Sequence, residues 1–283
     1  MPNDPVYQQL LITTLINTVL LGAAAGMVGM FLSTKKTEIS VNVASGAAFT
    51  GILILGFALG IGSSLTLTIF AAVFCLFLLV AVNFIIKTAK LNQFAVTSVT
   101  FSVLLGLCFA LLTFFGTKDS QLANEFGRFV LGDSVVILKH ETETALYIYI
   151  ASILTMLLGI KSFKYTLFSV QMAKTSKIHT GIFTALIFII TSAVASLGIQ
   201  IMGVLFLGFL FTAPAVMART LTKSFTPAVI LSGFIGSLSC FAGGIISGFN
   251  NHIPTGAATT VILAVPLLFL AYFSSKKIKD NSK

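Results

Sequence analysis

Charged side chains are scarce in this chain, and their scarcity excludes an ordinary soluble protein. Of the 283 residues, 9% are charged and 57% are hydrophobic, and the mean hydropathy is +1.04. A soluble domain carries about a quarter charged residues, because its surface faces water. The composition therefore predicts an integral membrane protein.

Tryptophan is absent and cysteine is rare. Cys75, Cys108 and Cys240 each stand alone inside an apolar run, without a CxxC pair or the spacing of a metal site. Isolated cysteines in such surroundings behave as small apolar residues. We expect all three to be buried packing residues rather than redox groups or metal ligands.

Catalytic and nucleotide-binding motifs are also missing. The phosphate-binding loop GxxxxGK[ST] does not occur, and GIKS at 159–162 is not such a loop. Neither HExxH nor GxSxG is present. The sequence thus predicts a protein that is not an enzyme and has no nucleotide site of its own.

What the chain does have is nine apolar runs long enough to cross a bilayer of about 30 Å as helices. They lie near residues 10–32, 43–61, 64–86, 94–116, 143–160, 181–198, 199–218, 227–249 and 255–273. The sixth and seventh runs are nearly continuous, and GIQ at 198–200 is the only break between them. We predict an all-α, polytopic helical bundle, with 1–283 as a single transmembrane domain of nine helices, or eight if one run is re-entrant.

Basic residues indicate the orientation of these helices. With the N-terminus outside, 14 of the 17 Lys and Arg residues fall in cytoplasmic loops or in the basic tail at 274–283. The remaining three are Lys118, Arg128 and Lys139. Because cytoplasmic loops are enriched in Lys and Arg, this predicts an outside N-terminus and a cytoplasmic C-terminus. The net charge of +9 follows from that topology and gives no reason to expect nucleic-acid binding.

Ionisable residues are missing from the interior of all nine runs. Carriers driven by proton or sodium gradients usually need such groups inside the bilayer, where a charge is costly and functional. Their absence favours an energy source outside this chain, namely a separate ATPase subunit. A self-contained secondary carrier or a channel stays as the alternative.

Small residues recur at helical spacing in the first run. Gly22 pairs with Gly26, and Ala25 pairs with Gly29. Small residues four positions apart let two membrane helices approach closely. We therefore expect a tightly packed bundle around this helix.

Two stretches of the sequence share residues with one family of transporters. The first joins GMVGMFL (26–32) to SVNVASGAAFTG (40–51), and the second is ASLGIQIMGVLFLGFLFTAPAVMA (195–218). Together they resemble the permeases of the zinc/manganese/iron class of ABC importers. Ser45, Ala47 and Gly51 match the family pattern of the first stretch, and Pro214 matches the proline of the second.

This resemblance implies a function and a set of partners. The expected protein is a multi-pass permease of the bacterial cytoplasmic membrane that imports a divalent metal ion and dimerises within the lipid bilayer. A cytoplasmic ATP-binding subunit would use the ATP, so this chain would bind no cofactor. An extracytoplasmic solute-binding protein would deliver the cargo.

The resemblance also implies a pathway site that departs from the family. Asn42, Ser45 and Gly46 occupy the pathway positions, but the family has Asp where Asn42 stands and His where Gly46 stands; Thr50 replaces a proline. A carboxylate and an imidazole suit zinc or manganese, whereas Asn offers one neutral oxygen and Gly offers no side chain. The metal ligands are thus unknown. Either the passage is polar and binds the metal weakly, or the cargo is a chelated metal or an organic solute.

The loop at 161–179 occupies the position of the ATPase-coupling element in these permeases. Ser169 and Gln171 stand where the family often has acidic residues, and Ala173 and Lys174 continue its pattern. An ordinary basic inner loop is the alternative. In the outer segment 117–143, metal capture by His140, Glu141 and Glu143 competes with a simpler solvated cluster, which we prefer. We expect the remaining histidines, His179 and His252, to be interfacial.

Overall fold

The computed structural model describes most of the chain, and the described residues form helices and no strand. These residues are 5–34, 40–59, 64–89, 92–117, 129–132, 139–168, 180–249 and 253–281. The main helices are α1 (Pro5–Thr34), α2 (Ser40–Leu59), α3 (Ser64–Ala89), α4 (Gln93–Gly116), α6 (Lys139–Leu158), α7 (Ile160–Phe168), α9 (Thr180–Met202), α10 (Val204–Leu221), α11 (Phe225–Phe249) and α12 (Thr255–Asn281).

The predicted apolar runs fall on the longer helices, although the seventh run, 199–218, begins in the last residues of α9 and continues into α10. Within the described residues, α1, α3, α4, α9, α10 and α11 are long and apolar enough to cross a membrane. Shorter apolar segments lie in the other three, at Val41–Gly56, Glu143–Leu158 and Thr255–Leu270. The predicted all-α membrane bundle is therefore confirmed as the architecture.

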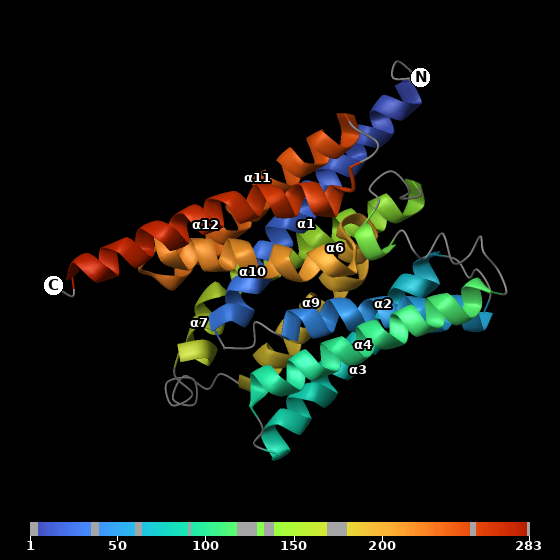
Figure 1. Cartoon of the computed structure of the whole chain (residues 1–283), viewed down its shortest axis with the longest axis horizontal. Helices are drawn as coiled ribbons and strands as arrows, with labels where there is room; N and C mark the ends of the chain where they lie inside the picture. Colours follow the sequence, from blue (N-terminus) through green and yellow to red (C-terminus); the bar gives the residue numbers. More distant parts are fainter. Residues whose placement is uncertain are drawn as a thin grey trace.

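Helix α1 crosses the middle of the bundle (Figure 1). It contacts α10, α11 and α6, and α12 packs against α10 and α11. On the opposite side, α3 and α4 pack against α2 (Figure 1). Helices α9 and α10 connect the two sides, because α9 contacts α3 and α10 contacts α2.

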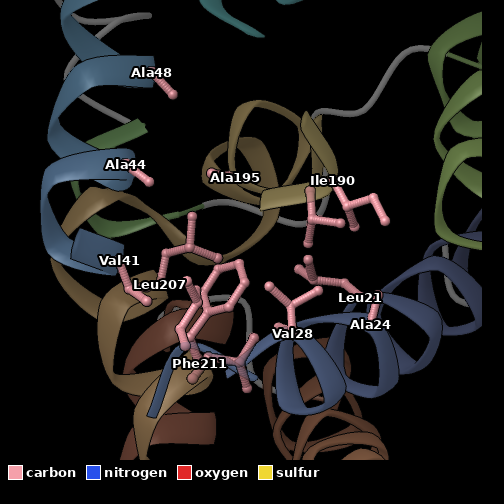
Figure 2. Close-up of a cluster of buried hydrophobic side chains, with 14 of the residues drawn as sticks. Leu21, Ala24, Val28, Val41, Ala44, Ala48, Ile190, Ala195, Leu207 and Phe211 are labelled. Carbon is pink, nitrogen blue, oxygen red and sulfur yellow. The ribbon is translucent and has the colours of Figure 1, made fainter. Parts of the chain in front are cut away.

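The centre of the core lies where α1, α2, α9 and α10 meet. Figure 2 shows Val28 of α1, Ala44 of α2 and Leu207 and Phe211 of α10 directed toward this region. All four of these side chains are buried. Ala24, Ala44 and Ala48 contribute small side chains to this region, and Leu21, Leu207 and Phe211 contribute large ones.

Glycines let α1 approach its neighbours to backbone distance, as the small-residue spacing predicted. A Cβ atom at Gly22 would collide with the carbonyl oxygen of Gly236 on α11. A Cβ at Gly26 would collide with the carbonyl oxygen of Ser232 on α11. The Ser232 hydroxyl in turn donates a hydrogen bond to the Gly26 carbonyl. Gly29 lies against the carbonyl of Phe211 on α10 in the same way.

The break between α9 and α10 is not where the sequence predicted it. Gly198 and Gln200 are helical, and α9 continues to Met202. The chain breaks at Gly203, which has φ 78° and ψ 158° and precedes the first residue of α10. Glycine adopts positive φ without the Cβ clash that other residues suffer, so the helix ends here and not at 198–200.

Candidate functional site

Asn42 lies in the first turn of α2 and faces α10. A Cβ atom at Gly208 would collide with the Asn42 Oδ1 atom, so the glycine makes room for the amide. Ser45, which is buried, donates a hydrogen bond of 2.9 Å to the Asn42 carbonyl. Asn42 therefore lies at the contact between α2 and α10, and Ser45 is hydrogen-bonded to the preceding turn of the same helix.

Gly46 faces a different neighbour. A Cβ atom at this position would lie 3.2 Å from Phe101 Cδ2 and 3.3 Å from Leu104 Cβ on α4. The family resemblance implied that Asn42 and Gly46 line one passage, and residues four apart on a helix share a face. In the structure Asn42 contacts α10 and Gly46 contacts α4, so their shared role in a passage stays a prediction.

Thr50, at the family proline position, stabilises the packing of α2. Its hydroxyl donates a 2.7 Å hydrogen bond to the Gly46 carbonyl and lies 3.1 Å from the sulfur of Cys108 on α4. Cys75 of α3 donates to the Ala44 carbonyl at 3.4 Å. Cys240 is buried as well, and all three cysteines are free thiols. The prediction that the cysteines are buried packing residues is confirmed.

Between residues 41 and 50 of α2, where the structure describes the side chains, the polar groups are neutral. They are the Asn42 amide and the hydroxyls of Ser45 and Thr50. Among the residues that the structure describes, no group of three or more His, Cys, Asp or Glu side chains is placed to hold a metal ion. Neutral oxygen atoms bind a divalent ion more weakly than carboxylates do, so such a region suits passage better than storage.

Four phenylalanines gather at one end of the bundle, and we call them the aromatic cluster: Phe31 of α1, Phe163 of α7, Phe183 of α9 and Phe225 of α11. The ring centroid of Phe31 lies 4.9 Å from that of Phe163 and 5.3 Å from that of Phe225. Phe163 and Phe183 are 5.3 Å apart. All three pairs are edge-to-face, an arrangement favoured by the ring quadrupoles. The sequence pattern does not predict this cluster, because its members are far apart along the chain.

Arg219 connects α10 to α1 at the same end of the bundle. Its Nη1 atom donates to the Ser33 hydroxyl at 2.7 Å and to the Ser33 carbonyl at 3.2 Å. Ser33 lies in the last turn of α1, where carbonyl groups have no partner within the helix. A cation there also interacts favourably with the helix dipole.

The opposite end of the bundle is closed by backbone contacts at the α9–α10 break. Gly132 has φ 79°, and a Cβ on it would meet the backbone of Met202 and Gly203. Gly256, in the first turn of α12, lies against the Met202 carbonyl. These contacts were not predicted, since a glycine with positive φ looks like any other glycine in a sequence.

Several predicted residues fall outside the part of the chain that the structure describes. These are Ser169, Gln171, Ala173 and Lys174 of the predicted coupling loop, together with His179 and His252. His140 and Glu141 belong to the first turn of α6, and Glu143 is exposed.

Proteins of similar sequence are membrane components of metal transport systems. The zinc transport system membrane protein TroC of Treponema pallidum is 25% identical over 248 residues, which cover 88% of this chain and 83% of TroC. The manganese transport system membrane protein MntC of Bacillus subtilis is 24% identical over 256 residues. That match covers 90% of this chain but 58% of MntC, so this chain spans little more than half of that relative.

A solved structure with the same fold is PsaBC from Streptococcus pneumoniae in complex with Fab. It superposes with a TM-score of 0.78 over 92% of this chain and 90% of the matched chain, at 20% sequence identity. The model of one protein family, described as the ABC 3 transport family, matches residues 7–275. A match over nearly the whole chain, on a helical bundle of the same fold, shows that this protein belongs to the ABC 3 transport family.

Proposed function

We propose that this chain is the membrane permease subunit of an ABC importer for a divalent metal ion, either zinc, manganese or iron. The observation that carries this proposal is the family match over residues 7–275. The names of TroC and MntC, a zinc and a manganese transport protein, support the metal cargo. ATP hydrolysis would belong to a separate subunit, in keeping with the absence of a nucleotide-binding motif from the sequence.

The proposed topology has nine crossings, with the N-terminus outside and the C-terminus in the cytoplasm of a bacterium. In that topology, successive helices cross the membrane in opposite directions, and contacts at the two ends of the bundle support this arrangement. The aromatic cluster and Arg219 bring together the end of α1, the segment after α6, the start of α9, the end of α10 and the start of α11. All these segments fall on the cytoplasmic side in the proposed topology. At the other end, Gly132, Gly203 and Gly256 bring together three segments assigned to the outside.

Labelling of single cysteines tests this orientation. A cysteine placed next to Lys276 should react with a membrane-impermeant reagent only after the membrane is permeabilised. One placed next to Asp119 should react in intact spheroplasts. Reaction of the first site from outside would reverse the orientation and remove the partner assignments that depend on it.

The proposed partners follow from that orientation. An ATP-binding subunit would dock at the basic cytoplasmic end and contact the loop with Ser169, Gln171, Ala173 and Lys174. A solute-binding protein would deliver cargo at the outer end, and two copies of this chain would form the transmembrane dimer. PsaBC, which shares the fold, and the ABC family match support this arrangement.

The proposed cargo path runs between α2 and α10 beside Asn42. Asn42 and Ser45 provide neutral oxygen atoms there, and Gly46 lets α2 pack closely against α4. With neutral ligands, a metal ion would be held weakly and released readily. The same uncharged chemistry favours a second candidate cargo, a metal that is already chelated and needs no ligands from the permease.

Reconstitution tests the energy source. The chain purified together with its ATP-binding and solute-binding partners should accumulate Mn²⁺ or Zn²⁺ in proteoliposomes only when ATP is supplied. The chain alone should not hydrolyse ATP and should not accumulate metal in a proton or sodium gradient. Gradient-driven uptake by the chain alone would replace this proposal with a secondary carrier.

The cargo path has its own test. Asn42→Asp adds a carboxylate beside α10, so the ion should bind more tightly and leave more slowly, and both KM and kcat of ATP-driven Mn²⁺ uptake should fall. Asn83→Asp on α3 is the matched control and should not lower KM. Equal kinetics for the Asn42 variant and the wild type would remove Asn42 from the path.

A further inference from the structure

In the part of helix α7 whose side chains are described, Phe163 lies between two lysines. Lys161 and Lys164 are exposed, whereas the Phe163 side chain is 1% exposed. Phe163 therefore attaches this part of the helix to the bundle. The helix ends at Phe168, directly before the segment proposed to contact the ATP-binding subunit.

Gly159 allows the Phe163 ring to fold back over the junction between α6 and α7. A Cβ atom at Gly159 would lie 2.5 Å from Phe163 Cε2, so the ring could not keep this position beside a larger residue. Backbone hydrogen bonds nevertheless run through the junction, from Gly159 to Thr155 at 3.0 Å and from Phe163 to Gly159 at 2.9 Å. The ring is thus enclosed by Gly159, Phe31 and Phe183, and α7 is tied to α1 and α9 as well as to α6.

A continuous series of close contacts leads from Phe163 to the candidate path. Phe31 touches Phe163, and two positions further along α1 Ser33 accepts hydrogen bonds from Arg219 of α10. On the same helix, Gly29 lies against the backbone of Phe211. Three residues before Phe211, Gly208 lies against Asn42 of α2. Neither of these glycine contacts leaves room for a methyl group, so a displacement of α1 cannot be absorbed by loose packing.

We propose that Phe163 is a positioning residue for energy coupling, which transmits movement of α7 to α1 and α10 and so to the contact between Gly208 and Asn42. This inference rests on the proposed function as an ATP-driven permease. Phe163 touches neither cargo nor ATP, and it acts through Phe31 and Phe183. Without its ring, α7 moves without moving α1, and ATP is hydrolysed without transport.

The test compares transport with hydrolysis in the assembled transporter. Wild type, Phe163→Ala and Phe183→Ala are purified with the ATP-binding and solute-binding partners and reconstituted in proteoliposomes. Mn²⁺ accumulated and ATP hydrolysed are measured in the same vesicles. The ratio of Mn²⁺ to ATP should fall roughly threefold or more in Phe163→Ala, within the range known for coupling residues remote from both ligands.

Two further variants separate positioning from stability. Leu158→Ala changes an exposed side chain at the end of α6, outside the predicted coupling element, and should keep the wild-type ratio. Phe163→Leu keeps most of the apolar contact and should restore most of the ratio. A purely structural role would reduce the yield of folded transporter in Phe163→Ala but leave the ratio unchanged among the molecules that fold.

Each outcome distinguishes this inference from the proposed function. If the wild type accumulates no Mn²⁺ with ATP, the proposed function fails and the coupling role fails with it. If the wild type is active and neither alanine variant lowers the ratio, the coupling role of Phe163 is overturned and the proposed function stands. If Phe163→Ala does not fold, the ratio of Mn²⁺ to ATP in Phe183→Ala still tests the coupling role. Phe183 is only half-buried, so its removal should disturb the fold less.

Discussion

Helices α1 and α4 are both apolar enough to cross a membrane, yet they have opposite surroundings. In the apolar segment of α1, 72% of the residues are buried, against 17% in that of α4. The buried helix uses Gly22, Gly26 and Gly29 to bring its backbone against other backbones. On α4, by contrast, Gly106 has no atom within 4 Å of the position that its Cβ would occupy.

This difference shows that hydropathy does not separate central from peripheral helices in a membrane protein. Lipid tails are as apolar as leucine, so burial inside the bundle depends on close packing and not on removal from water. Small residues at helical spacing mark the central helix, and exposed large side chains mark the peripheral ones. Substitutions at matched positions in the two regions test this distinction.

The largest effect is expected from Gly29→Ala. The new methyl group would collide with the Phe211 carbonyl and push α1 away from α10, and overpacking of this kind costs about 1–3 kcal/mol or more. Gly106→Ala is the matched control on α4, where the methyl group meets open space. Thermal midpoints from size-exclusion chromatography should fall clearly for the first and stay unchanged for the second. Similar midpoints for both variants would contradict the distinction between central and peripheral helices.

A smaller loss is expected from Gly203→Ala, at the break between α9 and α10. Alanine at φ 78° and ψ 158°, a conformation found essentially only in glycine, costs about 1–3 kcal/mol. The Cβ would also lie 2.5 Å from the Gly132 nitrogen, a less severe overlap than that of a Cβ at Gly29 with the Phe211 carbonyl. Gly181→Ala, with open space around it, is the control. A wild-type midpoint for Gly203→Ala would show that the break does not need a glycine.

These positions also show how far the sequence could predict the structure. The apolar runs placed the long helices, since length and hydropathy are local properties. The spacing of Gly22 and Gly26 predicted close packing, because four residues bring side chains to one helix face. The break at Gly203 was missed, since the choice between Gly198 and Gly203 depends on the backbone of Gly132, which is distant in the sequence.

The candidate site was less predictable than the fold. Asn42 and Gly46 were expected to share a passage, but which helix each residue meets depends on how α4 and α10 pack around α2. The aromatic cluster was missed for a similar reason. The chain has 27 phenylalanines, and nothing in the sequence distinguishes Phe31 and Phe163 from the others. Only the fold brings these two residues together.

A modest effect is expected from Ser232→Ala on α11. The change removes the hydrogen bond from the Ser232 hydroxyl to the Gly26 carbonyl, and such interhelical bonds contribute about 0.6 kcal/mol on average in membrane proteins. Ser237→Ala is the matched control, because its hydroxyl donates only to Phe234 of its own helix at 2.9 Å. Unfolding in mixed micelles should resolve the difference. Equal unfolding free energies would show that glycine packing alone holds α1 against α11.

The smallest effect is expected from Phe77→Ala on α3. Phe77 is 67% exposed and belongs to an apolar stripe on the outer face of that helix. Because lipid contacts a phenylalanine and an alanine about equally well, the unfolding free energy should change by less than about 0.5 kcal/mol, as for other exposed positions. Phe84→Ala, further along the same stripe, should behave alike. A large loss of stability that appears only in the dimeric transporter would mean that this stripe contacts the second permease subunit. Helix α3 would then be peripheral in one chain but central in the assembly, and the comparison with α1 would have to be made on the dimer.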